Sequence, residues 1–91
     1  LSLDNNKISD ISIIGRLTNL EYIFLSDNKI NVIGDLSNLK NLKKLVLNFN
    51  QINDISGLKN LNESVKIQLS YNPITDWSPV AHIKEVYGRP L

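Results

Sequence analysis

The chain lacks cysteine altogether and has a single histidine among its 91 residues. Without a thiol it can form no disulfide, no thiolate nucleophile and no cysteine-based metal site. With His82 alone, it cannot build a zinc site of the HExxH type. We also find no nucleophile paired with a base and no glycine loop that would cradle a phosphate. These absences predict a protein that is not an enzyme and that holds neither cofactor nor metal.

Long apolar runs and clustered charges are missing as well. No run approaches the roughly 18 apolar residues that a membrane-crossing helix needs, and no basic and then apolar leader opens the chain. Ten basic and nine acidic residues are interspersed, giving a net charge of +1. A nucleic-acid footprint would require basic residues gathered in a stripe. We therefore expect neither membrane insertion nor a nucleic-acid partner.

What the sequence does contain is a repeat. The stretch from Leu42 to Ile52 returns along the chain at a spacing of 22 residues, always with aliphatic residues or the same asparagine in equivalent places. Eight columns follow, with few exceptions: Leu1, Ile23, Leu45, Ile67; Leu3, Leu25, Leu47, Leu69; Asn6, Asn28, Asn50, Asn72; Ile8, Ile30, Ile52, Ile74; Ile11, Ile33, Ile55, Trp77; Ile14, Leu36, Leu58, Val80; Leu17, Leu39, Leu61, Ile83; and Leu20, Leu42, Ser64, Val86. A fixed period of this length predicts a solenoid whose units stack only on their neighbours.

The pattern L-x-x-L-x-L-x-x-N-x-I-x-D-I-x-x-L-x-x-L resembles the leucine-rich repeat. Its 22-residue period and the I-x-D-I segment, as in Ile52-Asn53-Asp54-Ile55, resemble the short internalin-like class of bacterial surface proteins. A similar class occurs in regulatory subunits of protein phosphatases. Over residues 1 to about 86, the resemblance implies an α/β solenoid, a horseshoe fragment with short parallel strands on its concave face and 3₁₀ or irregular turns on its convex face. It also implies a secreted protein or one on the bacterial cell surface.

The repeats divide the chain into residues 1–76, about four repeats with the first truncated, and a C-terminal capping segment, residues 77–91. Past Val86, the next strand column falls on Arg89, between Gly88 and Pro90, so we expect the sheet to stop there. Leu1 enters in the middle of a repeat with no polar cap before it. Either the chain is a fragment of a longer array, which we favour, or its open end self-associates through the strand edge.

The asparagine column follows the predicted strands. An inward amide can both donate and accept, so it can satisfy backbone groups where the chain bends and can bridge to a neighbouring repeat. We therefore interpret Asn6, Asn28, Asn50 and Asn72 as a structural ladder and not as a ligand site.

The return segments contain the signals of short helical turns. Serine follows Ile11, Ile55 and Trp77, where it could cap such a turn, and Gly34-Asp35 takes this place in the second repeat. The recurring aspartates before these serines are better explained by that turn than by metal binding: Asp10, Asp54 and Asp76.

Two departures from the pattern carry expectations of their own. Ser64 occupies a core column, so either Val65 turns inward in its place, which we favour, or the last repeats pack more loosely. Trp77 should cover part of the terminal repeat with its larger ring. His82 is expected at a solvated surface position.

Residue type stops repeating at the outward strand positions. The columns there are Tyr22, Lys44, Lys66; Ser2, Phe24, Val46, Gln68; Asp4, Ser26, Asn48, Ser70; and Asn5, Asp27, Phe49, Tyr71. Phe24 and Val46, with Tyr22 beside them, predict an exposed apolar centre with a polar margin, as in interaction hot spots. The opposing interpretation is that these two are ordinary strand formers and that Phe49 and Tyr71 only shield the asparagines.

We interpret the chain as a protein-binding module that uses its concave face. The lysines would attract acidic groups of a partner whose identity is open. The candidate residues are Tyr22, Phe24, Lys44, Val46, Asn48, Phe49, Lys66, Gln68 and Tyr71. Two alternatives stay open: a rigid spacer between other domains, and a regulatory subunit that docks on an enzyme.

Overall fold

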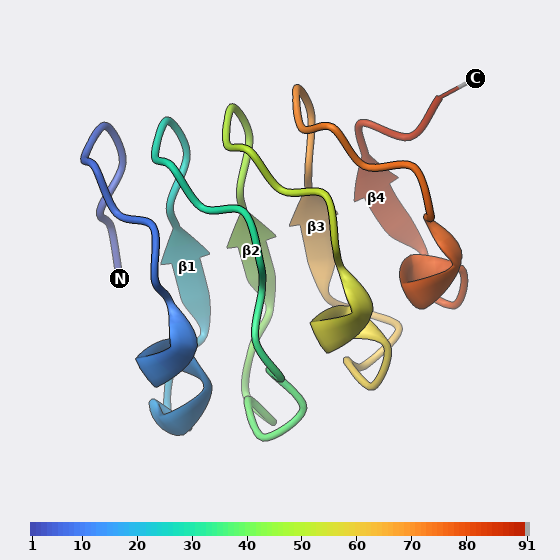
Figure 1. Cartoon of the computed structure of the whole chain (residues 1–91). Helices are drawn as coiled ribbons and strands as arrows, with labels where there is room; N and C mark the ends of the chain where they lie inside the picture. Colours follow the sequence, from blue (N-terminus) through green and yellow to red (C-terminus); the bar gives the residue numbers. More distant parts are fainter. Residues whose placement is uncertain (91) are drawn as a thin grey trace.

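The computed structural model describes residues 1–90, which form an open parallel sheet with the chain returning along its other side (Figure 1). The strands are β1 (Tyr22–Phe24), β2 (Lys44–Val46), β3 (Lys66–Gln68) and β4 (Glu85–Tyr87), and they lie in sequence order. Three 3₁₀ helices lie on the return side: η1 (Ser12–Arg16), η2 (Ser56–Leu58) and η3 (Ser78–Val80). Each unit therefore stacks on the one before it, and the predicted solenoid is confirmed.

The 22-residue period sets the register of the first three strands. Tyr22 pairs with Lys44, and Lys44 pairs with Lys66. The last unit is shorter, because Lys66 pairs with Glu85, only 19 positions later. The expectation that the sheet stops after β3 was therefore wrong: Val86 lies in β4, beside Ile67, and not in the column of Leu42.

The chain turns sharply directly after β4. Gly88 has a φ of +109°, and a Cβ there would lie 2.7 Å from the Ser70 nitrogen, so this turn over β3 requires glycine. The Arg89 guanidinium then donates to the Val80 carbonyl at 2.6 Å, at the end of η3. The proposed capping segment thus contributes a strand and a tie to the return side. Its last residue, Leu91, lies outside the described residues, and the boundary at residue 77 stays a prediction.

The first unit continues the sheet through a single bridge, Ser2 to Phe24, and not through a full strand. The Leu3 amide donates to the Phe24 carbonyl at 2.8 Å, and the Phe24 amide donates to the Leu1 carbonyl at 2.9 Å. Leu1 and Leu3 are 41% and 38% exposed, whereas their equivalents in the second unit, Ile23 and Leu25, are fully buried. A stacked unit on both sides is what completes burial.

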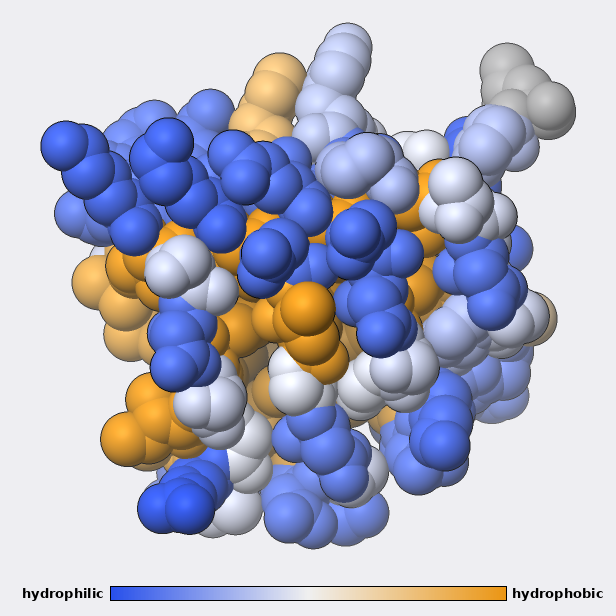
Figure 2. Space-filling view, in the orientation of Figure 1, coloured by the Kyte–Doolittle hydropathy of each residue, from blue (hydrophilic) through white to orange (hydrophobic). Residues whose placement is uncertain are grey.

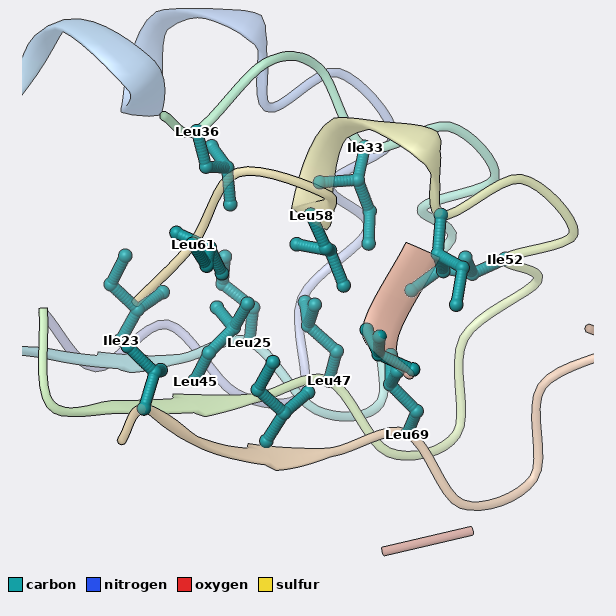
Figure 3. Packing of buried hydrophobic residues seen from close by; sticks show 14 of the residues in the cluster. Ile23, Leu25, Ile33, Leu36, Leu45, Leu47, Ile52, Leu58, Leu61 and Leu69 are labelled. Carbon is teal, nitrogen blue, oxygen red and sulfur yellow. The ribbon is translucent and has the colours of Figure 1, made fainter. Parts of the chain in front are cut away.

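The aliphatic columns meet in a continuous core between the sheet and the return segments (Figure 3). Val65 is 1% exposed while Ser64 is exposed, so Val65 takes the inward place and the favoured expectation is confirmed. The Val65 amide donates to the Asn62 carbonyl at 3.1 Å, as the Leu42 amide does to the Leu39 carbonyl at 3.2 Å. Trp77 packs against the core as a partly buried ring.

Aspartates, and not serine side chains, organise the return turns. The residues that precede the three helices are Ile11, Ile55 and Trp77, and none makes a side-chain capping bond. An aspartate Oδ1 instead accepts the serine backbone N–H at 2.9 to 3.0 Å, in the pairs Asp10 with Ser12, Asp54 with Ser56 and Asp76 with Ser78. The expected serine caps were therefore wrong.

The second return segment forms no helix within the described residues, contrary to the start expected at Gly34-Asp35. Val32 stands where the other units have the aspartate, so the acceptor is missing. Asp35, which lies three positions after Val32, accepts the Ser37 amide at 2.9 Å instead.

Most of the return side is hydrophilic, with apolar groups showing between the units (Figure 2).

Candidate binding face

The register places the outward side chains of the sheet in two rows. Lys44 lies between Tyr22 and Lys66, and Val46 lies between Phe24 and Gln68. The strand residues predicted for the site therefore come together on one face. Two further residues extend these rows, Glu85 beside Lys66 and Tyr87 beside Gln68. The sequence did not reveal them, because the 22-residue period points three positions past them.

The sequence predicted that Val46 forms part of an exposed apolar centre, and this prediction was wrong. Its side chain is only 9% exposed, since it lies in register between Phe24 and Gln68 on strands that are close neighbours. Phe24 is half-buried, while Tyr22 is 47% exposed and Tyr87 is 54% exposed. The accessible aromatic surface of the strands thus lies toward the two ends of the sheet and not at its middle.

Polar side chains of this face are partly occupied by bonds within the protein. Asn48 donates through Nδ2 to Gln68 Oε1 at 2.9 Å, and its Oδ1 accepts the Ser70 amide at 2.8 Å. Asp4 Oδ1 likewise accepts the Ser26 amide at 2.6 Å. These bonds fix the turn that follows each strand. The charged ends of Lys44 and Lys66 form no salt bridge within residues 1–90.

The last outward column forms an edge where the strands end, which we call the rim: Asn5, Asp27, Phe49 and Tyr71. The rings of Phe49 and Tyr71 stack there, with centroids 4.5 Å apart and planes inclined by 7°. Phe49 is 51% exposed and Tyr71 is 76% exposed. Figure 2 shows a hydrophobic and a near-neutral side chain rising next to each other from this edge.

All four rim residues have left-handed backbone, with φ between 57° and 61°. Asparagine and aspartate tolerate this conformation well, whereas an aromatic residue there costs on the order of 1 to 2 kcal/mol. Ring stacking returns about 0.5 to 1.5 kcal/mol. Stacking therefore recovers only part of the combined strain of about 2 to 4 kcal/mol, and the exposure of the two rings gives little burial in return.

Below the rim, the asparagines connect neighbouring units. Asn50 Nδ2 donates to its own turn at Leu47 O, 3.2 Å, and to the preceding unit at Leu25 O, 3.0 Å, while Oδ1 accepts the Ile30 amide at 3.1 Å. Asn28 and Asn72 make the equivalent bonds. Asn6 bonds only within its own turn, to Leu3 O and Asp4 O. The amides thus lock the rim turns to one another.

Titratable groups on the return side serve the fold. Hydrogen bonds from the serine at the turn hold the pKa of each turn aspartate below its ordinary value, as for Asp10 with Ser12 and Asp35 with Ser37. Within residues 1–90, no group of three acidic or histidine side chains is arranged to hold a metal ion. His82 is exposed, as expected, and its Nε2 lies 2.8 Å from the Leu61 carbonyl oxygen, a bond to the preceding unit.

Comparison with known proteins agrees with this geometry. The family described as leucine-rich repeats, two copies, matches residues 18–60. The crystal structure of an internalin C2 from Listeria monocytogenes superposes with a TM-score of 0.83 and 37% identity, over 94% of this chain and 38% of that one. The chain belongs to the leucine-rich repeat family, with repeats of the internalin type. An internalin F from the same species gives a TM-score of 0.81 and 33% identity, over 92% of this chain and 26% of that one.

This internalin-like chain thus spans well under half the length of these two solved relatives. No curated protein matches it significantly. No helix within residues 1–90 is long and apolar enough to cross a membrane.

Proposed function

We propose that this internalin-like unit binds a protein partner through its concave face and the adjoining rim, and that it acts by recognition and not by catalysis. The observation that carries the proposal is the stacked, exposed pair of Phe49 and Tyr71 in left-handed backbone, where asparagine or aspartate would be less strained. Stability alone does not account for two aromatics at these positions.

The rest of the face supplies what an interface needs. Tyr22 and Tyr87 offer exposed aromatic surface at the two ends of the sheet, and the unpaired Lys44 and Lys66 lie between them for acidic groups of the partner. The relatives are internalins, which supports placing the parent protein outside the cell or on the bacterial surface. The spacer and the enzyme-docking subunit remain the alternatives to binding through this face.

The test is affinity capture from an extract of target-cell surface proteins with a concave-face variant, Tyr22→Glu with Lys66→Glu. The matched control is Ile13→Glu with Lys59→Glu on the return side, where both residues are exposed and the change in charge is the same. Circular dichroism should show both variants folded with similar melting. Binding through the concave face predicts that a specific protein is lost from the first variant and retained by the second. Equal capture by both variants would reject the concave face and favour the spacer.

A further inference from the structure

The carboxylate of Asp27 is unused by the fold. The aspartates of the return turns and Asp4 accept backbone amides, and Glu21 and Glu63 form salt bridges with Lys43 and Lys84. Asp27 is exposed, and within residues 1–90 its side chain takes part in no hydrogen bond or salt bridge. An acidic group with no internal task stands on the rim, one unit away from Phe49.

The stacking geometry shows where the free face of Phe49 points. Phe49 and Tyr71 occupy equivalent positions of adjacent units, and their rings are parallel at 4.5 Å, so the ring normals run along the solenoid axis. One face of Phe49 is covered by Tyr71. The opposite face of the ring is therefore directed toward the preceding unit. There Asp27 occupies the equivalent position, with the same φ of 57° as Phe49. The two neighbours are tied by backbone, since the Asp27 amide donates to the Asn48 carbonyl at 3.0 Å.

We propose that the rim binds an arginine side chain of the partner, between the Asp27 carboxylate and the open face of Phe49. This inference rests on the proposed function and specifies which group the partner contributes. A guanidinium is planar and cationic, so it can lie against the ring while its edge donates to the carboxylate. The stacked Tyr71 fixes the orientation of the Phe49 ring, so little order has to be gained on binding.

The geometry favours arginine over lysine and over an acidic group. An ammonium is a compact and strongly hydrated charge that cannot lie flat on the ring and also present a fork of donors to a carboxylate. An acidic group would meet the Asp27 charge and the negative face of the ring. The rim and the lysines of the sheet thus have opposite charge preferences, which would set the orientation of a partner across the face.

The experiment uses the whole chain and a small probe, so it does not depend on knowing the partner. N-acetyl-arginine methylamide is titrated while the ring protons of Phe49 and Tyr71 are followed by NMR, with the citrulline and lysine counterparts as controls. Only two phenylalanines and three tyrosines are present, which makes assignment direct. We expect saturable shifts of the Phe49 ring with the arginine compound, and an apparent affinity at least threefold higher than with either control.

Variants locate the site. Asp27→Asn keeps a residue suited to left-handed backbone and should lower the arginine affinity at least threefold, and Phe49→Asn should abolish the saturable response at Tyr71. Glu63→Gln, which removes an exposed carboxylate that lies outside both the strands and the rim, should leave the affinity unchanged. Equal responses to arginine, lysine and citrulline, no saturable shift, or an unaffected Asp27→Asn variant would each overturn the proposal. A negative titration removes only the arginine site when the concave-face variant still loses the captured protein. When that variant captures the same protein as its matched control, the proposed function itself fails.

Discussion

Replacing Asn50 by alanine should be far more costly than making the same change at Asn6, although both stand in one column. Asn50 is 8% exposed, accepts the Ile30 amide and donates to carbonyls of its own unit and of the preceding one. Removing it leaves the buried Ile30 amide without its partner and breaks both carbonyl bonds, although Leu25 O still accepts from Asn28 and Leu47 O from Asn72. Asn6 is exposed and bonds only to two carbonyls of its own turn.

The magnitude follows from those bonds. A hydrogen bond contributes about 0.5 to 1.5 kcal/mol net, and a buried group left without a partner costs about 1 to 3 kcal/mol. We expect Asn50→Ala to lower the free energy of unfolding by about 3 to 5 kcal/mol and Asn6→Ala by about 1 kcal/mol or less. For a domain of this size, each kcal/mol lowers Tm by about 4 to 8 °C.

Urea unfolding followed by circular dichroism measures both values, and the slope with denaturant shows whether the transition stays two-state. Asn50→Asp is a useful companion, because it keeps the acceptor for the Ile30 amide but directs a charge at the carbonyls that Asn50 contacts. It should be at least as harmful as alanine. Similar losses for Asn50→Ala and Asn6→Ala would refute the reasoning that the bonds between units carry the stability.

Three further predictions concern the core, the close contacts and pH. Leu47→Ala removes a fully buried side chain and should cost about 2 to 5 kcal/mol in a urea titration; an unchanged midpoint would contradict the stacked core. Gly57→Ala should lower Tm much more than Gly34→Ala, because a Cβ at Gly57 would lie 2.1 Å from the Gly34 carbonyl oxygen while one at Gly34 meets only Ser12 Cα at 3.9 Å; equal melting would argue against that contact. Because serine bonds lower the folded-state pKa of the turn aspartates, their stabilisation is present above the ordinary value of 3.8 and is lost as pH falls below it. The free energy of unfolding should be lower at pH 3 than at pH 7, and this difference should become smaller when the turn aspartates are replaced by asparagine. An equal difference in the variant would exclude these aspartates as the cause. The four residues are Asp10, Asp35, Asp54 and Asp76.

The sequence predicted the structural features that follow from the 22-residue period. It predicted far fewer of the features that depend on contacts between units. The solenoid, the parallel order of strands and the inward turn of Val65 followed from a repeat that packing keeps uniform. The 19-residue step to β4 did not, because where a shortened unit pairs is decided by its contact with β3. Equally, the aspartate caps replaced the expected serine caps because a carboxylate two residues earlier is better placed to accept the serine amide.

The candidate site shows the same division. The sequence identified the variable outward columns, but the burial of Val46 depends on what Phe24 and Gln68 do on either side of it. Left-handed backbone at Phe49 and Tyr71 could not be read from their residue types, which disfavour it. Asp27 was visible in the same column, yet only the hydrogen bonds of the fold show that no group within residues 1–90 uses its carboxylate.

The asparagine amides give the solenoid a direction. Within residues 1–90, the ladder residues Asn28, Asn50 and Asn72 each bond to the unit before them and not to the unit after: Asn28 holds Leu3 and Ile8, and Asn72 holds Leu47 and Ile52. A unit is thus secured by its successor, and local unfolding of β4 breaks none of the ladder bonds within residues 1–90, because β4 takes part in none of them. Local unfolding of the first unit instead breaks the bonds of Asn28 to Leu3 and Ile8, while Asn28 keeps the bonds to its own turn. The two ends of the same array should therefore differ in how readily they fray.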